Sequence, residues 1–95
     1  MISLDTVSSS EFEACLQEIF SLVLSDGKFP LQLDKVTLIT GRHPEAKRAP
    51  FSLTFKAGHP IRLPQSIYTL EHERLGSMEV FLVQTSPTEV EAVFN

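Results

Sequence analysis

The sequence predicts a mostly β fold (α+β) with one N-terminal helix, in which an antiparallel meander of about six strands forms a small barrel or strongly bent sheet. Short segments alternate apolar and polar residues at the two-residue period of a half-buried strand. Gly- and Pro-containing turns separate these segments at close spacing. The chain has 95 residues, which suffices for one modest core, so we expect residues 1–95 to form a single domain.

The first expected element is a short helix from about Ser8 to Glu18, because Ser8 with Glu11, and likewise Ser10 with Glu13, have the spacing of a capping box. Its apolar face would carry Phe12, Cys15, Leu16, Ile19 and Phe20. A strand from Ile19 to Ser25 is expected next, since apolar and polar residues alternate there. The alternative is one long helix that continues through Val23 and Leu24 and ends at Asp26-Gly27.

The remaining elements are expected to be strands. Their predicted bounds are Phe29–Thr40, Phe51–Ala57, Ile67–His72, Ser77–Gln84 and Glu89–Phe94, with a polar loop over Gly41–Pro50. The apolar positions of the first of these strands change parity near Asp34-Lys35, which predicts a β-bulge there. Gly76 is expected to supply an unusual backbone conformation in a turn. The strand through Phe81 is apolar on both faces, so we expect it at the sheet centre or covered on both sides, with Phe81 in the core.

Composition and charge restrict the classes of function. The formal net charge of −4 makes nucleic-acid binding unlikely as a function. Basic residues are concentrated in one loop, where Arg42, Lys47 and Arg48 are a candidate surface for an acidic partner; the alternative is a solvated loop. The single cysteine, Cys15, fits a reducing compartment. No segment resembles a signal peptide or a membrane span, so we expect a cytoplasmic protein without membrane contact.

No set of residues has the pattern of a catalytic or metal site. His72 lies between Glu71 and Glu73, but a strand would point it away from both, and zinc usually takes three or four protein ligands. Cys15 on the apolar helix face is expected to be a buried structural thiol. Gln65 is interpreted either as a residue that ties its loop to the sheet or as a contact for a partner. We therefore expect no enzyme activity, no cofactor and no metal.

The C-terminal third resembles a family of small bacterial domains of unknown function. The shared pattern is Leu-Pro-Gln-Gly-x-Tyr-x-Leu-x-His, a Leu-Gly turn, an apolar strand and a terminal Tyr-Glu-Ala-Val-Phe-Asn, which correspond here to Leu63–His72, Leu75-Gly76, Glu79–Val83 and Glu91–Asn95. Ser66 stands where the pattern has Gly, and Val90 where it has an aromatic residue. The resemblance implies a small, mostly β fold and no established activity. It also implies that relatives are encoded beside phage-tail-type proteins.

Two hypotheses for function follow. The first is a non-enzymatic structural or protein-interaction module, accessory to a phage-tail-like assembly, whose partner is another protein or a second copy of the chain. Its contact surface would be an exposed edge strand or the basic loop, with Gln65, Tyr68 and His72 as further candidate contact residues. The alternative is a small-molecule binder or small enzyme that uses a barrel mouth lined by Tyr68, His72 and nearby carboxylates.

Overall fold

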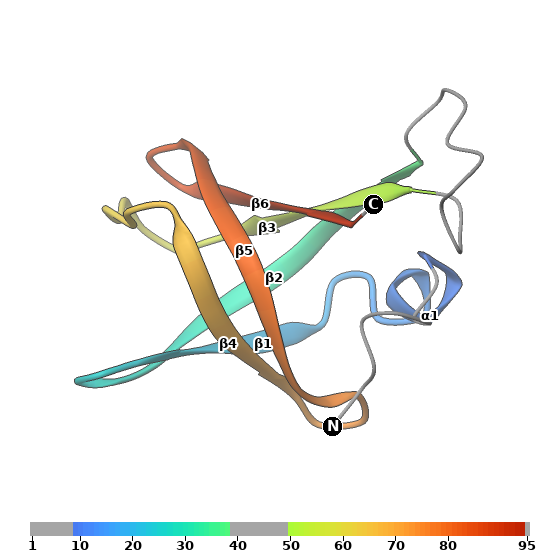
Figure 1. Ribbon diagram of the computed structural model, residues 1–95, viewed down its shortest axis with the longest axis horizontal. Coiled ribbons are helices and arrows are strands. Elements are labelled where there is room, and N and C mark those ends of the chain that lie inside the picture. The colour runs from blue at the N-terminus through green and yellow to red at the C-terminus, as the bar shows by residue number, and fades with distance from the viewer. Residues whose placement is uncertain (1–8, 39–49, 95) are drawn as a thin grey trace.

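The computed structural model of the protein describes residues 9–38 and 50–94 and shows a closed barrel of six antiparallel strands with one short helix (Figure 1). The elements are α1 (Ser9–Glu13), β1 (Ile19–Leu24), β2 (Gly27–Leu38), β3 (Phe51–Lys56), β4 (Ser66–His72), β5 (Gly76–Ser86) and β6 (Glu89–Phe94). The expected mostly β class, the helix and the antiparallel barrel are thus confirmed. No helix within the described residues has the length and apolar character needed to cross a membrane.

The strand order around the barrel is β1-β2-β3-β6-β5-β4. Two three-stranded meanders, β1–β3 and β4–β6, are therefore joined by the pairs β3–β6 and β1–β4. The connection over residues 57–65 leads from β3 to β4, which are not neighbours. Because the barrel closes, the described strands leave no free edge along the sheet, and the expectation of an exposed edge strand as a contact surface is wrong.

The core is built from inward-facing alternate positions of every strand. The buried apolar side chains from the strands are Phe20, Leu22, Leu31, Leu33, Phe51, Leu53, Phe55, Leu70, Met78, Val80, Leu82, Val90, Ala92 and Phe94. The predicted bulge is confirmed, because the β2–β3 register shifts between Leu33 and Lys35. The predicted conformation of Gly76 is also confirmed by its φ of 81°.

The helix α1 covers one end of the barrel, at the ends of β3 and β6 (Figure 1). Phe12 is fully buried, and its ring packs against those of Phe51 and Phe94 with centroid distances of 5.8 and 5.4 Å. We call this the helix end of the barrel. The opposite end, where β1 and β3 finish, is the open end.

The helix is shorter than expected, and the alternative of one long helix is wrong. Within residues 9–38 and 50–94, only Ser9–Glu13 is α-helical, and β1 begins at Ile19. Gln17 has a φ of 70°, and its N–H donates to the carbonyl of Leu33 on β2, so the chain pairs with a strand instead of extending the helix. Leu16 and Ile19, expected on a buried helical face, are exposed as a result. Of the two expected caps, Ser8 lies outside the described residues and Ser10 lies within α1.

Phe81 is also placed differently from the expectation. Its neighbours Val80 and Leu82 point into the barrel, whereas Phe81 points outward and is 50% exposed. A closed barrel has one interior, so an apolar residue on the other face of a strand needs an additional layer to be buried. The described residues supply no such layer over Phe81, and its assignment to the core is wrong.

Candidate functional site

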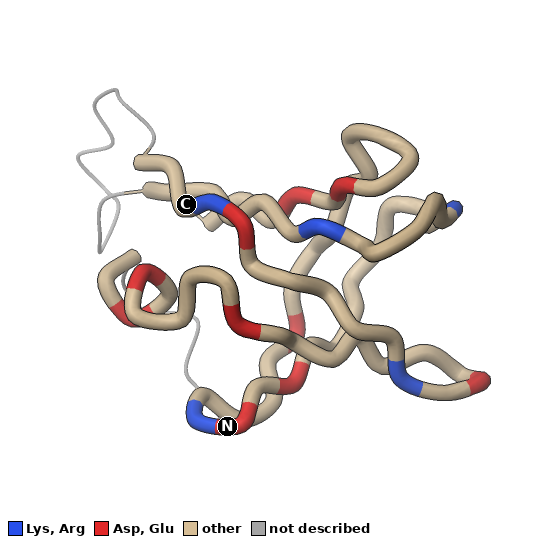
Figure 2. Tube along the Cα trace, turned by 180° about the vertical axis from the view of Figure 1, so that it is seen from behind, with Lys and Arg blue, Asp and Glu red and all other residues tan. Residues whose placement is uncertain are grey.

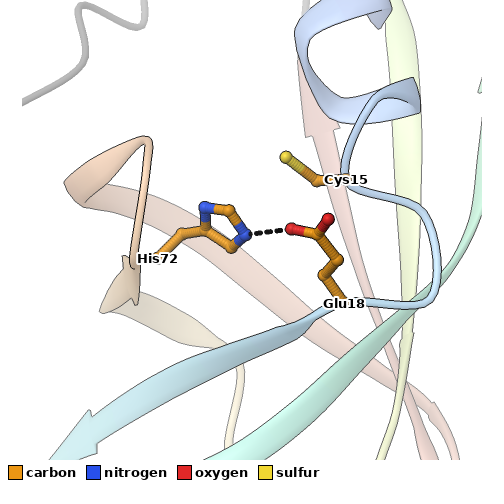
Figure 3. A group of neighbouring side chains, drawn as sticks. All are labelled: Cys15, Glu18 and His72. Atoms are coloured by element: carbon orange, nitrogen blue, oxygen red, sulfur yellow. Dashed lines mark hydrogen bonds and ion pairs between the residues drawn. The ribbon is translucent and has the colours of Figure 1, made fainter.

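Four polar or reactive side chains converge at the helix end of the barrel. Cys15 and Glu18 lie on the segment between α1 and β1, whereas His72 and Arg74 lie at the end of β4 and in the turn that follows it. Figure 3 shows Cys15, Glu18 and His72 pointing toward one another. We call Cys15, Glu18, His72 and Arg74 the barrel latch, because they join the start of β1 to the β4–β5 turn.

His72 is the buried centre of the latch. Its Nδ1 lies 3.1 and 3.2 Å from the backbone nitrogens of Arg74 and Leu75, and its Nε2 lies 2.7 Å from Oε1 of Glu18 (Figure 3). Backbone N–H groups can only donate, so Nδ1 must accept. The ring proton is therefore on Nε2, and the Nε2–H group donates a hydrogen bond to the Glu18 carboxylate.

Arg74 completes the pairing of Glu18. One guanidinium nitrogen, Nη2, lies 2.6 Å from each carboxylate oxygen of Glu18 and 3.6 Å from Sγ of Cys15. The hydrogen bonds from Arg74 and then from His72 lower the pKa of the Glu18 carboxyl below its ordinary range. Glu18 is thus an ionised acceptor that two donors share.

Cys15 is packed beneath this ion pair and is 2% exposed, which confirms the expected burial. Burial, and next the negative charge of Glu18, raise the pKa of its thiol, although Arg74 acts in the opposite direction. A nucleophilic cysteine needs a lowered pKa and a base within reach. The raised pKa of the Cys15 thiol does not fit this role. His72 does not supply the base either, because its Nε2 carries a proton toward Glu18 and its Nδ1 accepts from backbone donors.

The same geometry argues against a metal centre. Potential ligand atoms of Cys15, Glu18 and His72 lie within 4.8 Å of one another. A histidine that binds a metal through Nε2 normally donates its Nδ1 proton to an acceptor. Nδ1 of His72 instead faces two backbone donors, and the Arg74 cation occupies the carboxylate of Glu18. These residues fit a hydrogen-bonded latch better than they fit a metal ion.

The other candidate contact residues predicted from the sequence do not join the latch. Tyr68 donates its hydroxyl to the carbonyl of Pro64 at 2.5 Å, and Gln65 is exposed without a hydrogen bond to any described residue. Ser66 begins β4, and its φ is not positive, so the Gly-to-Ser departure causes no backbone strain. Arg42, Lys47 and Arg48 lie outside the described residues.

A cavity of about 450 Å³ adjoins the latch, and a smaller one of about 210 Å³ lies at the open end. The larger is lined by Ile19, Ser21, Glu71, His72, Glu73, Gly76 and Ser77, and the smaller by Leu22, Leu24, Phe29, Ile61, Arg62 and Leu63. Tyr68 lines neither of them, so these cavities do not bring Tyr68 and His72 together as the sequence suggested.

The outer face of β4, β5 and β6 carries a row of exposed apolar side chains, Ile67, Phe81 and Val93, which we call the outer apolar row. Ile67 and Phe81 are direct register partners, and Val93 lies beside Phe81 one residue beyond the last β5–β6 pair, Leu82–Ala92. Ile67 is 65% exposed, and Phe81 and Val93 are each 50% exposed. This row was not predicted from the sequence. An apolar residue on the outward face of a strand and one on the inward face cannot be told apart when both faces are apolar.

Two further residues were not predicted from the sequence. No partner was predicted for Arg74 or for Gln84, yet Arg74 pairs with Glu18, and Gln84 bonds to the β3–β4 connection at both Ile61 and Leu63. Their partners are 21 to 56 residues away in the sequence, so no local spacing could have indicated them.

Comparison with known proteins gives a family and no activity. Neither the curated proteins nor the solved structures yielded a match to this chain. Residues 7–94 match the family described as Domain of unknown function (DUF6916), and since this is nearly the whole chain, the protein belongs to that family.

Proposed function

We propose that the protein is a non-enzymatic interaction module that binds a partner protein through the outer face of β4, β5 and β6. The observation that carries this proposal is the outer apolar row, in which three large apolar side chains from three adjacent strands are at least half exposed. Contiguous exposed apolar groups surrounded by polar residues are typical of interaction sites, and aromatic residues often dominate their binding energy.

The charges around the row indicate the chemistry of the partner. Strands β4, β5 and β6 contain no Lys or Arg, whereas each contains at least one Glu (Figure 2). Glu79 and Glu91 lie on the same outward face as Phe81 and Val93. A partner with apolar side chains surrounded by Lys or Arg would be complementary. A second copy that docked by the same face would bring like charges together, so a different protein is favoured.

The mode of contact differs from strand addition. Because the described strands close into a barrel, a partner gains no free row of backbone donors and acceptors. Binding would therefore depend on side chains, with Phe81 at the centre of the row. The latch supports a non-enzymatic role, since its histidine and cysteine lack the geometry of a base and a nucleophile.

The sequence resemblance suggests which partners to test first. The resemblance implies that relatives are encoded beside phage-tail-type proteins, and on this basis we propose a role as an accessory of a phage-tail-like assembly. Proteins encoded next to this chain would be purified and measured for binding by isothermal titration calorimetry. Those with an apolar face bordered by Lys or Arg are expected to bind.

The decisive comparison uses Phe81→Ser with Ile19→Ser as a matched control, because Ile19 is 54% exposed and lies outside the row. If Phe81 is a central contact, its loss should weaken binding by about thirtyfold or more, which corresponds to roughly 2 kcal/mol. Ile19→Ser should leave the affinity unchanged. Equal affinities of Phe81→Ser and the original chain would contradict the proposal, provided that thermal unfolding shows both variants to be folded.

A further inference from the structure

The smaller cavity lies at the open end of the barrel, far from the latch. Its walls come from two places: Leu22, Leu24 and Phe29 belong to the β1–β2 hairpin, and Ile61, Arg62 and Leu63 belong to the β3–β4 connection. In Figure 1 this hairpin and this connection lie at the side of the barrel away from α1. Leu22 and Leu63 are buried, so the cavity reaches the edge of the core.

The wall formed by the β3–β4 connection is held in place by polar contacts. Oε1 of Gln84 accepts the N–H of Leu63 at 2.8 Å, and Nε2 of Gln84 donates to the carbonyl of Ile61 at 2.7 Å. The N–H of Ile61 also donates to the carbonyl of Pro87 at 2.8 Å. A wall fixed at both neighbours of Arg62 needs little ordering when a ligand binds.

The opposite wall is equally defined. Leu22 and Phe29 are register partners in the hairpin, and the ring of Phe29 packs edge-on against His59 with centroids 5.2 Å apart. Lys28, next to Phe29, forms an ion pair with Glu71, with Nζ and Oε1 2.6 Å apart. The apolar surfaces that face the cavity are therefore formed before any ligand arrives.

Arg62 is the charged residue among the six that line this cavity. It is exposed and has no ion pair or hydrogen bond with any other described residue. A guanidinium offers five donors in a planar fork, which matches the two oxygens of a carboxylate. An apolar cavity bordered by an unpaired guanidinium thus combines the two groups that an apolar acid requires.

We propose that this cavity binds a small apolar carboxylate, with its hydrocarbon part against Leu22, Phe29 and Leu63 and its carboxylate at Arg62. The volume of about 210 Å³ limits the apolar part. A buried apolar cavity of about 150 Å³ holds a benzene ring, so one ring or a short aliphatic chain fits here and a long-chain fatty acid does not. The site is separate from the outer apolar row and does not depend on the proposed docking function.

Benzoate is a suitable probe, and its binding would be followed at neutral pH by two-dimensional amide NMR of the full chain. Benzyl alcohol has the ring without the charge, and acetate has the charge without the ring. Benzoate is expected to produce saturable shifts at amides of the hairpin and of residues 61–63. Benzyl alcohol should bind more weakly, and acetate should give no saturable change.

Two matched variants test the role of Arg62. Arg62→Gln should lower the affinity for benzoate about two- to fivefold, the range expected for an exposed ion pair, and leave that for benzyl alcohol unchanged. Lys35→Gln removes the same charge at an exposed position of β2 outside the cavity and should change neither affinity. N-Acetyl-leucine presents the same chemistry at a chain terminus. If it binds more tightly than benzoate, the carboxylate is that of a peptide end; if more weakly, it is that of a free acid.

The proposal is overturned if benzoate gives no saturable shift up to about 10 mM, where a ligand held by both groups should be bound. It is also overturned if the shifts map to the helix end of the barrel, or if Arg62→Gln binds benzoate as tightly as the original chain. None of these results bears on the docking proposal, which is tested by Phe81→Ser with protein partners.

Discussion

His72 and Glu18 are 54 residues apart in the chain, and a 2.7 Å hydrogen bond joins them across the helix end of the barrel. The barrel closes where β1 pairs with β4, and this pairing brings Glu18, just before β1, next to His72 at the end of β4. The bond links the first strand to the fourth at the point where both meet the segment after α1. It is the centre of the latch and should contribute to the stability of the fold.

Removal of His72 should therefore be costly. His72→Ala leaves the backbone N–H groups of Arg74 and Leu75 without their acceptor, and we expect a loss of about 2–4 kcal/mol in the free energy of unfolding. His59→Ala, at an exposed position, should cost less than about 1 kcal/mol. Urea denaturation of both variants measures the difference. Similar losses for the two histidines would show that the latch contributes little.

Stability should depend on the ionisation of Glu18. Its folded-state pKa is lowered, so its contribution is fully present above the ordinary value of 4.5 and is lost as the pH falls below that value through the folded-state pKa. Glu18→Gln should flatten this acid loss, whereas Glu79→Gln, an exposed carboxylate on β5, should retain it. Urea unfolding at pH values from 7 to 3 provides the comparison. An unchanged acid profile in Glu18→Gln would contradict the assignment.

The thiol of Cys15 should react slowly in the folded protein. Its pKa is raised by burial, and its side chain is covered, so both the thiolate fraction and the access of a reagent are low. We expect Ellman's reagent to modify the native chain much more slowly than the chain in concentrated urea. Rapid modification of the unaltered native chain would be inconsistent with the buried position.

The two faces of the strands should respond differently to the same substitution. Phe55 is fully buried, and Phe55→Ala should cost about 3–5 kcal/mol because it removes a core ring and leaves a cavity. Phe81→Ala should cost less than about 1 kcal/mol, since the ring is half exposed. The denaturant midpoints of the two variants measure how much each of the two rings contributes to stability. A loss of several kcal/mol in the free energy of unfolding of Phe81→Ala would show that the Phe81 ring is buried.

Gln84, on β5, and Gln65, just before β4, should differ in how much each stabilises the β3–β4 connection. Gln84→Ala removes the bonds to Leu63, Ile61 and Ser86 and should cost about 1–3 kcal/mol. Gln65→Ala removes no hydrogen bond to a described residue and should be nearly neutral. Hydrogen exchange at the Leu63 amide should accelerate in Gln84→Ala alone. Equal behaviour of the two variants would mean that Gln84 does not hold the connection.

Much of the fold could be predicted from local pattern. The strand Phe51–Lys56 alternates at period two, and the parity change near Asp34 gave the position of the bulge. The residue at which α1 stops could not be predicted in the same way. Gln17 has a non-helical backbone conformation, and its N–H donates to Leu33 on β2, which is distant in the sequence. Local propensity contains no information about such a partner.

The candidate sites were less predictable than the strands. His72 was singled out from the sequence, but its partners Glu18 and Arg74 were not, since only the folded barrel brings them together. Phe81 was assigned to the core because periodicity shows that a strand has two faces and does not show which face is covered when both are apolar. Arg62 is a candidate because the β1–β2 hairpin and the β3–β4 connection, which are separate in the sequence, line one cavity.

By itself, the sequence determined the class of the fold, the number and approximate bounds of the strands, the bulge and the turn at Gly76, because these depend on neighbours along the chain. The tertiary structure decided that β3 pairs with β6 and β1 with β4, and therefore which side chains meet at the latch, which apolar residues remain outside, and what lines the open end. The physical reason is that barrel closure sets the register between strands distant in sequence, and this register depends on the packing of the whole core.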